Sequence, residues 1–199
     1  YTIERDSILT HSSSTYAFSL YKTSVSDEDG KAVITYTDKL GHKVMVERNG
    51  KRVYYVYDEL ERLRYVLPHI PQEKLPYGEF APNNDILRSS AYYYQYDAHG
   101  NMIYKRLPGC EPQYMVYDKT GQLILKQDGN QRLNNKWTLC AYDSLGRNLY
   151  TAEIPLQQSH EDLITLFANI WSVEHYGNNP SNKSIPTTGY ASTILGKNH

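Results

Sequence analysis

The stretch "SHED" at residues 159–162 brings together side chains that hydrolytic enzymes use: a hydroxyl, an imidazole and two carboxylates. The four residues are consecutive, so within one helical turn they cannot converge on a substrate as nucleophile, base and orienting acid. Ser159 followed by Asp162 three residues later is instead typical of a helix N-cap. The stretch therefore predicts the start of a helix and not a catalytic site.

The rest of the chain offers equally little to catalysis or metal binding. Phosphate-binding, dinucleotide-binding, zinc-protease and nucleophile-elbow motifs do not occur in it. Asp27, Glu28 and Asp29 lack the alternate-residue spacing of a calcium loop and predict a solvated hairpin tip. His42 and His99 stand in or beside turns, where polar residues are common. We therefore expect no metal site, no cofactor and no enzymatic activity.

The two cysteines do not define a redox site. Cys110 follows a Pro-Gly turn and Cys140 stands in an apolar segment, and neither belongs to a Cys-x-x-Cys motif. Their pairing stays open, and unpaired each is expected to pack as a small buried apolar side chain. The glycosylation pattern "NKS" at Asn182 is short enough to arise by chance.

One pattern recurs: Tyr-Asp, two variable residues and Gly. Aligned on Asp, the five copies read "TYTDKLGHKV", "YVYDELERLR", "YQYDAHGNMI", "MVYDKTGQLI" and "CAYDSLGRNL". Glu61 replaces the Gly of the second copy. The positions that define the repeat are Asp38, Gly41, Tyr57, Asp58, Tyr96, Asp97, Gly100, Tyr117, Asp118, Gly121, Tyr142, Asp143 and Gly146.

The pattern has a structural explanation in the β-hairpin. An Asp at the first position of a type I turn accepts a hydrogen bond from the backbone two residues later, and a residue with positive φ then closes the turn as a bulge. Gly adopts that conformation without steric penalty. Glu61 is expected either to adopt it with about 1 to 2 kcal/mol of strain or to mark a different turn.

Turn signals come about every ten residues, with β-favouring segments between them, and predict a mainly β fold: an antiparallel meander of hairpins forming a curved sheet, either open or a partial barrel. Residues 1–18 are expected to lead in as strand, and residues 19–154 to form the sheet. A Pro-rich insertion at 67–91 predicts a surface loop or edge segment with a short helical turn. Residues 155–176 predict one amphipathic helix, and residues 177–199 an extended tail or linker.

Composition limits the partners. Lys and Arg number 21 against 22 Asp and Glu, a net charge of −1, so the chain lacks the basic field that nucleic-acid binding needs. No apolar run is long enough for a membrane-spanning helix. Tyrosine is the unusual residue, with 20 copies, and it suits half-buried strands because it is bulky, β-favouring and polar at one end.

The copies "YDELERLRYVLP", "YQYDAHGNMIYKRLPG", "YMVYDKTGQLILKQDGNQ" and "YDSLGRNLY" resemble the YD repeats of the Rhs family, large bacterial cell-surface or secreted proteins. The resemblance covers roughly residues 19–154. It implies consecutive hairpins that, in longer arrays, spiral into a hollow shell around a C-terminal toxic or variable domain. It also implies a cell-surface or secreted location, with roles in competition, adhesion or carbohydrate binding. About five copies are too few to close a shell, and no segment resembles the family's self-cleaving core.

The resemblance and the residues together favour a non-enzymatic structural segment of a larger Rhs-type protein, forming β-sheet wall with neighbouring repeats of the same longer chain as partners. The alternative is a carbohydrate-binding or adhesion module that uses exposed tyrosines, with cell-surface carbohydrate as partner and binding residues unknown. A structural role for the recurring Tyr rests on cross-strand aromatic pairing. An open sheet also leaves two edges, so we expect the isolated chain to dimerise edge to edge.

Overall fold

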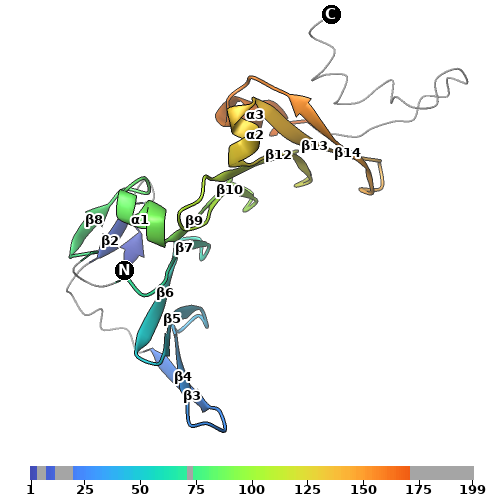
Figure 1. The fold of residues 1–199 in the computed structure, drawn as a ribbon. Helices are drawn as coiled ribbons and strands as arrows, with labels where there is room; N and C mark the ends of the chain where they lie inside the picture. The colour runs from blue at the N-terminus through green and yellow to red at the C-terminus, as the bar shows by residue number, and fades with distance from the viewer. Residues whose placement is uncertain (4–7, 12–19, 71–73, 171–199) are drawn as a thin grey trace, which may run out of the picture. The chain divides into compact units, whose positions relative to one another are not determined.

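The computed structural model describes residues 1–3, 8–11, 20–70 and 74–170, and it consists mainly of antiparallel β-strands (Figure 1). Eleven strands form one sheet in the order β14-β13-β12-β11-β10-β9-β7-β6-β5-β4-β3. They are β3 (Tyr21–Ser26), β4 (Ala32–Thr37), β5 (Lys43–Arg48), β6 (Lys51–Tyr57), β7 (Leu63–Leu67), β9 (Tyr92–Tyr96), β10 (Met102–Arg106), β11 (Gln113–Tyr117), β12 (Leu123–Gln127), β13 (Lys136–Tyr142) and β14 (Asn148–Pro155). Each strand neighbours the next one in the chain, apart from the omission of β8. The outermost strands are different strands, so the sheet is open, which confirms the predicted antiparallel meander.

A second, small sheet joins the lead-in to the insertion. It contains β1 (Thr2–Ile3), β2 (Leu9–His11) and β8 (Gly78–Phe80), with β2 in the middle. Residues 4–7 and 12–18 of the predicted lead-in lie outside the described residues. The small sheet gives the insertion a strand of its own, outside the main sheet.

The insertion at 67–91 contains a strand, a short helix and two buried leucines. It carries β8 and the helix α1 (Asp85–Ser90), whose first turn is capped by the Asn84 side chain. Leu75 and Leu87 of this segment are fully buried. The prolines keep the segment out of the main sheet, but they do not prevent its leucines from packing.

The structure contains three short helices among the described residues; the sequence predicted an amphipathic helix at 155–176 and a short helical turn in the insertion, where α1 lies. The helix α2 (Gly129–Leu133) was not predicted: Asp128–Gly129 is one of the turn signals between strands, but Asp128 and Gln131 form a reciprocal capping box that begins a helix there. The helix α3 (His160–Phe167) lies within the predicted segment 155–176, while β14 extends as far as Pro155. Residues 171–176 and the predicted tail at 177–199 lie outside the described residues. None of the helices in the described part of the chain is long and apolar enough to cross a membrane.

The described residues divide into two compact units. The first unit consists of Tyr1–Gln95 and Lys105–Glu111, and the second of Tyr96–Tyr104 and the described residues from Pro112 onward. In the first unit no residue of β3, β4 or β5 is buried, so this part of the sheet is a single layer with both faces accessible. Its core lies further along, where the buried rings of Tyr65 and Tyr93 are 4.7 Å apart.

The second unit has a conventional two-layer core. The helix α3 buries Leu163 and Phe167 against one face of the sheet, together with Trp137 of β13. Burial of each large apolar side chain contributes about 1.5 to 3 kcal/mol. Cys140 is buried in this unit, whereas Cys110 is exposed, so the expectation of burial was wrong for Cys110 because it follows an open turn. Cys110 and Cys140 are not joined by a disulfide in the structure.

Candidate functional site

The five Tyr-Asp copies form hairpin turns of one geometry, and these turns are the candidate site. We number the copies by their turn Asp: copy 1 (Asp38), copy 2 (Asp58), copy 3 (Asp97), copy 4 (Asp118) and copy 5 (Asp143). In every copy the Asp N–H donates to the carbonyl of the fourth residue after it, and the Asp carbonyl accepts from the N–H of the third residue. In the ladders of copies 1, 2, 4 and 5 the register shifts by one residue beside the turn. Each turn is therefore a type I turn closed by a bulge.

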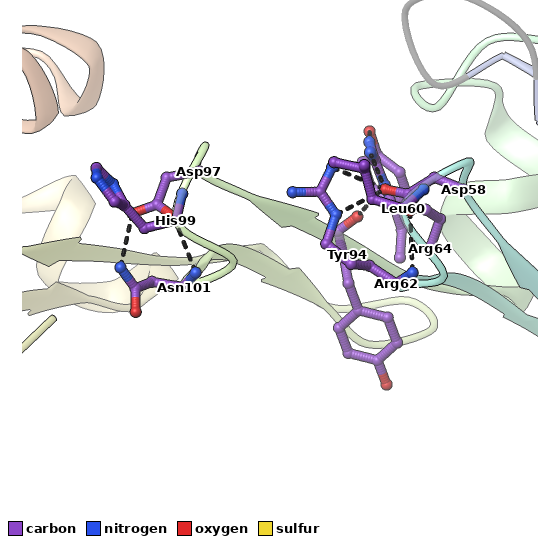
Figure 2. Close-up of polar contacts among 9 residues, drawn as sticks. Asp58, Leu60, Arg62, Arg64, Tyr94, Asp97, His99 and Asn101 are labelled. Atoms are coloured by element: carbon purple, nitrogen blue, oxygen red, sulfur yellow. Dashed lines mark hydrogen bonds and ion pairs between the residues drawn. The ribbon is translucent and has the colours of Figure 1, made fainter.

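The first carboxylate oxygen of each turn Asp is used within the turn. In all five copies Oδ1 accepts hydrogen bonds from the backbone N–H of the second and fourth residues after the Asp. In copy 1 these donors are Leu40 at 2.9 Å and His42 at 2.8 Å, and in copy 4 Thr120 at 2.8 Å and Gln122 at 3.0 Å. Figure 2 shows this arrangement in copies 2 and 3. In each copy the carboxylate thus satisfies two backbone N–H donors of the turn.

The second oxygen, Oδ2, receives the side chain of the fourth residue in four copies. The contacts are Arg62 Nε to Asp58 at 2.9 Å, Asn101 Nδ2 to Asp97 at 2.9 Å, Arg147 Nε to Asp143 at 2.7 Å, and His42 Nδ1 to Asp38 at 3.1 Å. Sequence reasoning missed this position. The signal was readable, because the fourth residue is polar in every copy: His42, Arg62, Asn101, Gln122 and Arg147.

These contacts favour the ionised form of Asp58 and Asp38. Burial alone would raise the pKa of Asp58, but hydrogen bonds and the charge of Arg62, with a further bond from Arg64, lower that pKa below its ordinary value. The pKa of Asp38 is lowered in the same way by bonds from His42, again against the effect of burial. A carboxylate with a low pKa and both oxygens occupied is suited to hold a turn and poorly suited to donate protons.

The Tyr before the Asp reaches the preceding copy. The Tyr57 hydroxyl donates to the Lys43 carbonyl at 3.1 Å, and the Tyr142 hydroxyl donates to the Leu123 carbonyl at 3.0 Å. Lys43 and Leu123 both stand fifth after the Asp of the preceding copy, so the two bonds are equivalent. Burial, followed by the charge of Asp38 in the preceding copy, raises the pKa of Tyr57. The hydroxyl therefore stays protonated and able to donate.

Tyr117 is influenced by the preceding copy through charge: its pKa is raised by burial and then by the charge of Asp97. Its hydroxyl lies 3.9 Å from the Met115 sulfur. Tyr96 ends β9 and is half-buried. All four recurring tyrosines thus stand at the strand end next to their turn.

In copies 4 and 5 the third residue after the Asp lies next to the fourth residue of the preceding copy. A Cβ added to Gly146 would lie 2.9 Å from Gln122 Nε2, and one added to Gly121 would lie 3.4 Å from Asn101 Oδ1. Gly121 and Gly146 therefore satisfy two demands, a positive φ and room for a neighbouring side chain, whereas Gly41 and Gly100 meet only the first. In copy 2 the non-Gly residue at this position has a φ of 61°.

Glu61 therefore adopts the same turn as its glycine counterparts instead of marking a different one. Its carboxylate lies 3.5 Å from Nε2 of His42, the fourth residue of copy 1. Because Asp38 approaches Nδ1 and Glu61 approaches Nε2, the two carboxylates lie on opposite sides of the imidazole. They consequently do not surround a common point where a cation could bind.

The other candidates from the sequence are placed as follows. Ser159 caps α3 by accepting from the Asp162 N–H at 3.1 Å. His160 is buried, stacks on Tyr114 with ring centroids 4.5 Å apart, and contacts the Met115 carbonyl through Nε2 at 3.0 Å. The burial lowers the pKa of His160. "SHED" is thus a helix start in which the imidazole packs into the core.

The acidic hairpin tip at 27–29 repeats the same turn chemistry. The Asp27 Oδ1 accepts from the Lys31 N–H at 2.7 Å, and Lys31 Nζ lies 3.4 Å from Asp29. Within the described part of the chain, no three His, Cys, Asp or Glu side chains lie close enough to hold a metal ion. His99 lies at the tip of the copy 3 turn (Figure 2), and Asn182 lies outside the described residues.

The second unit also has a groove of about 300 Å³ where α2 meets the sheet. Its lining includes Tyr114, Lys126, Gln131 and Thr138. The Gln131 amide already donates to the Thr138 hydroxyl at 2.8 Å. The Tyr114 ring is engaged by His160 and by Arg132, whose Cζ lies 4.2 Å from the ring centroid. The Gln131 amide, the Thr138 hydroxyl and the Tyr114 ring of this groove are therefore used internally.

Comparison with known proteins gives only weak likenesses, all of them to solved structures. No protein-family model matches the chain, and no curated protein matches it. Among solved structures, the chain is similar to a chain in a structure titled "Crystal Structure of TcdB2-TccC3-TEV", with 15% sequence identity and a TM-score of 0.47. The likeness covers 65% of this chain and 6% of that chain. This chain thus spans a small fraction of the length of the protein that it resembles.

Proposed function

We propose that the chain is a non-enzymatic structural segment of a larger Rhs-type protein, in which consecutive YD hairpins form a β-sheet wall at the cell surface or in a secreted particle. The observation that carries the proposal is the recurrence of the copy-to-copy contacts. In copies 2 and 5 the Tyr hydroxyl binds the same carbonyl of the preceding copy. An array that grows by adding identical units needs a junction of this kind.

Two further observations support the proposal. Both carboxylate oxygens of Asp58, Asp97 and Asp143 accept hydrogen bonds within their own hairpins, so these acids serve architecture. The strands β3, β4 and β5 have two accessible faces and no buried residue, as a wall between two aqueous spaces requires. Tyr and Thr side chains suit such a sheet because each combines an apolar body with a polar end.

The test is to sequence the gene on both sides of this segment. The proposal expects further Tyr-Asp-x-x-Gly copies in frame, each with a polar residue at the fourth position after the Asp. A reading frame that contains no further copies on either side would contradict it, because about five copies cannot enclose a volume.

The carbohydrate-binding alternative stays a prediction with its own measurement. A glycan panel probed by Tyr and Trp fluorescence would detect stacking of a sugar on an exposed ring. Binding that is lost on substitution of Tyr21 or Tyr77, which are 64% and 55% exposed, would favour the alternative. Silence across the panel would remove it.

A further inference from the structure

The strand β3 is an unusually unprotected sheet edge. Among the described residues its only neighbour in the sheet is β4, with which all six of its residues pair without a shift in register. Natural edge strands are usually blocked by proline, by a bulge or by several charges. The strand "YKTSVS" has no proline and one charged residue, Lys22. By contrast, the other outer strand, β14, carries Glu153 and ends at Pro155.

The side chains of β3 are exposed although several are apolar. Tyr21 is 64% exposed and Val25 is 65% exposed, and Leu20 just before the strand is 45% exposed. Tyr21, Thr23 and Val25 share one face of the sheet because side chains alternate along a strand. Because these β-favouring side chains lie on an edge strand whose outer backbone groups are open, β3 is suited to pair with a strand of another chain.

The sequence of β3 is compatible with itself in one particular register. Two copies of the strand related by a two-fold axis normal to the sheet run antiparallel, and residues directly opposite each other lie on the same face. With the axis at Thr23, Tyr21 of each copy is opposite Val25 of the other copy, and the two Thr23 residues are opposite each other. On the other face, Lys22 is opposite Ser24, so no like charges meet.

We propose that β3 pairs with β3 of a second copy of this chain, forming a two-fold dimer with Thr23 on the axis. The pairing contains two aromatic to β-branched pairs and one Thr–Thr pair, which are among the favourable cross-strand combinations. The pairing also provides hydrogen-bond partners for the backbone N–H and C=O groups that point away from β4 in each copy of β3. The proposal concerns the 199-residue chain, because in a longer array a repeat that precedes β3 would pair with the same edge.

The first experiment measures the mass of the full 199-residue chain by sedimentation velocity under reducing conditions, over a wide range of concentration. The expected result is a concentration-dependent species of twice the mass of one chain. Thr23→Lys should raise the dimer Kd about tenfold, because two ammonium groups then face each other at the axis. A chain that stays monomeric at the highest concentration overturns the proposal.

The matched control is Thr151→Lys, which makes the same chemical change at an exposed residue of β14. It should leave the Kd unchanged. Circular dichroism of both variants shows whether they fold. If Thr151→Lys weakens the dimer as much as Thr23→Lys does, the interface is not β3 and the proposal is wrong.

The second experiment tests the register. In a Cys110→Ser background, Thr23→Cys places two thiols opposite each other on the axis, whereas Ser24→Cys places each thiol opposite Lys22 of the other copy. Mild oxidation should give a disulfide-linked dimer with Thr23→Cys and much less with Ser24→Cys. Equal yields, or the reverse order, contradict the proposed pairing.

Discussion

Replacing Asp58 by Ala should destabilise the first unit by about 3 kcal/mol, and this change tests the structural role of the turn carboxylates. The Asp58 side chain is 11% exposed and accepts from the Leu60 and Arg62 N–H groups at 3.0 and 2.9 Å. It also binds the guanidinium groups of Arg62 at 2.9 Å and Arg64 at 3.3 Å. A neutral hydrogen bond contributes about 1 kcal/mol and one to a charged group about 1.5 to 3 kcal/mol. Because water replaces part of these contacts at the rim of the turn, the expected loss is below their sum.

Asp58→Asn should cost about half as much, since the amide oxygen still accepts the two backbone N–H groups while the ion pairs with Arg62 and Arg64 are lost. The assay is urea unfolding followed by circular dichroism, with hydrogen exchange of residues 51–67 to locate the effect. Asp27→Ala is the matched control, because its turn has the same backbone bonds but Asp27 is exposed. Its cost should stay below about 1 kcal/mol.

The charge of Asp58 also predicts a dependence on pH. Its lowered pKa means that the folded protein releases this proton more readily than the unfolded chain does. The stabilisation is therefore complete above the ordinary value of 3.8 and is lost as the pH falls below it. Asp58→Asn should remove that part of the acid sensitivity. The reasoning is refuted if Asp58→Ala and Asp27→Ala cost the same, or if Asp58→Asn leaves the acid profile unchanged.

Two further predictions concern the second unit and its packing. Gly146→Ala should cost more stability than Gly30→Ala, because both residues have a φ near +75° but only a Cβ added at position 146 would lie close to Gln122, at 2.9 Å. The left-handed conformation alone costs about 1 kcal/mol in either variant. Equal losses in urea unfolding would argue against the contact with Gln122. The lowered pKa of His160 means that the folded state resists its protonation, so the second unit should lose stability as the pH falls below about 6.5. His160→Gln, compared by thermal unfolding at several pH values, should flatten that loss, and a profile identical to that of the unsubstituted chain would contradict the assignment.

The turns could be predicted from sequence because each depends on residues close together in the chain. The turn Asp and the Gly three residues after it fix the geometry of the turn locally, and the positive φ of Gly100 and Gly146 follows from this geometry. The fourth position was overlooked because its residue changes from copy to copy. His, Arg and Asn differ in charge and shape, yet in four copies each brings an N–H donor to the Asp Oδ2.

The contacts between distant segments could not be predicted in this way. His160 meets Met115, which is 45 positions away, only because the sheet topology brings α3 onto β11. The packing of Leu75 and Leu87 in the insertion likewise depends on the second sheet, which no local signal announces. The helix α2 is different, since the capping box of Asp128 and Gln131 was present in the sequence and outweighed the Gly that suggested a turn.

The most direct test of the repeated junction is hydrogen exchange on Tyr57→Phe, which removes the hydroxyl that binds the Lys43 carbonyl. The loss of this bond should cost about 0.5 to 1.5 kcal/mol. The account predicts faster exchange in both joined copies, over residues 38–48 and 51–67, with no change in β11 and β12 of the second unit. Faster exchange confined to the copy that carries the substitution would show that the Tyr does not join neighbouring copies, and would contradict the central claim.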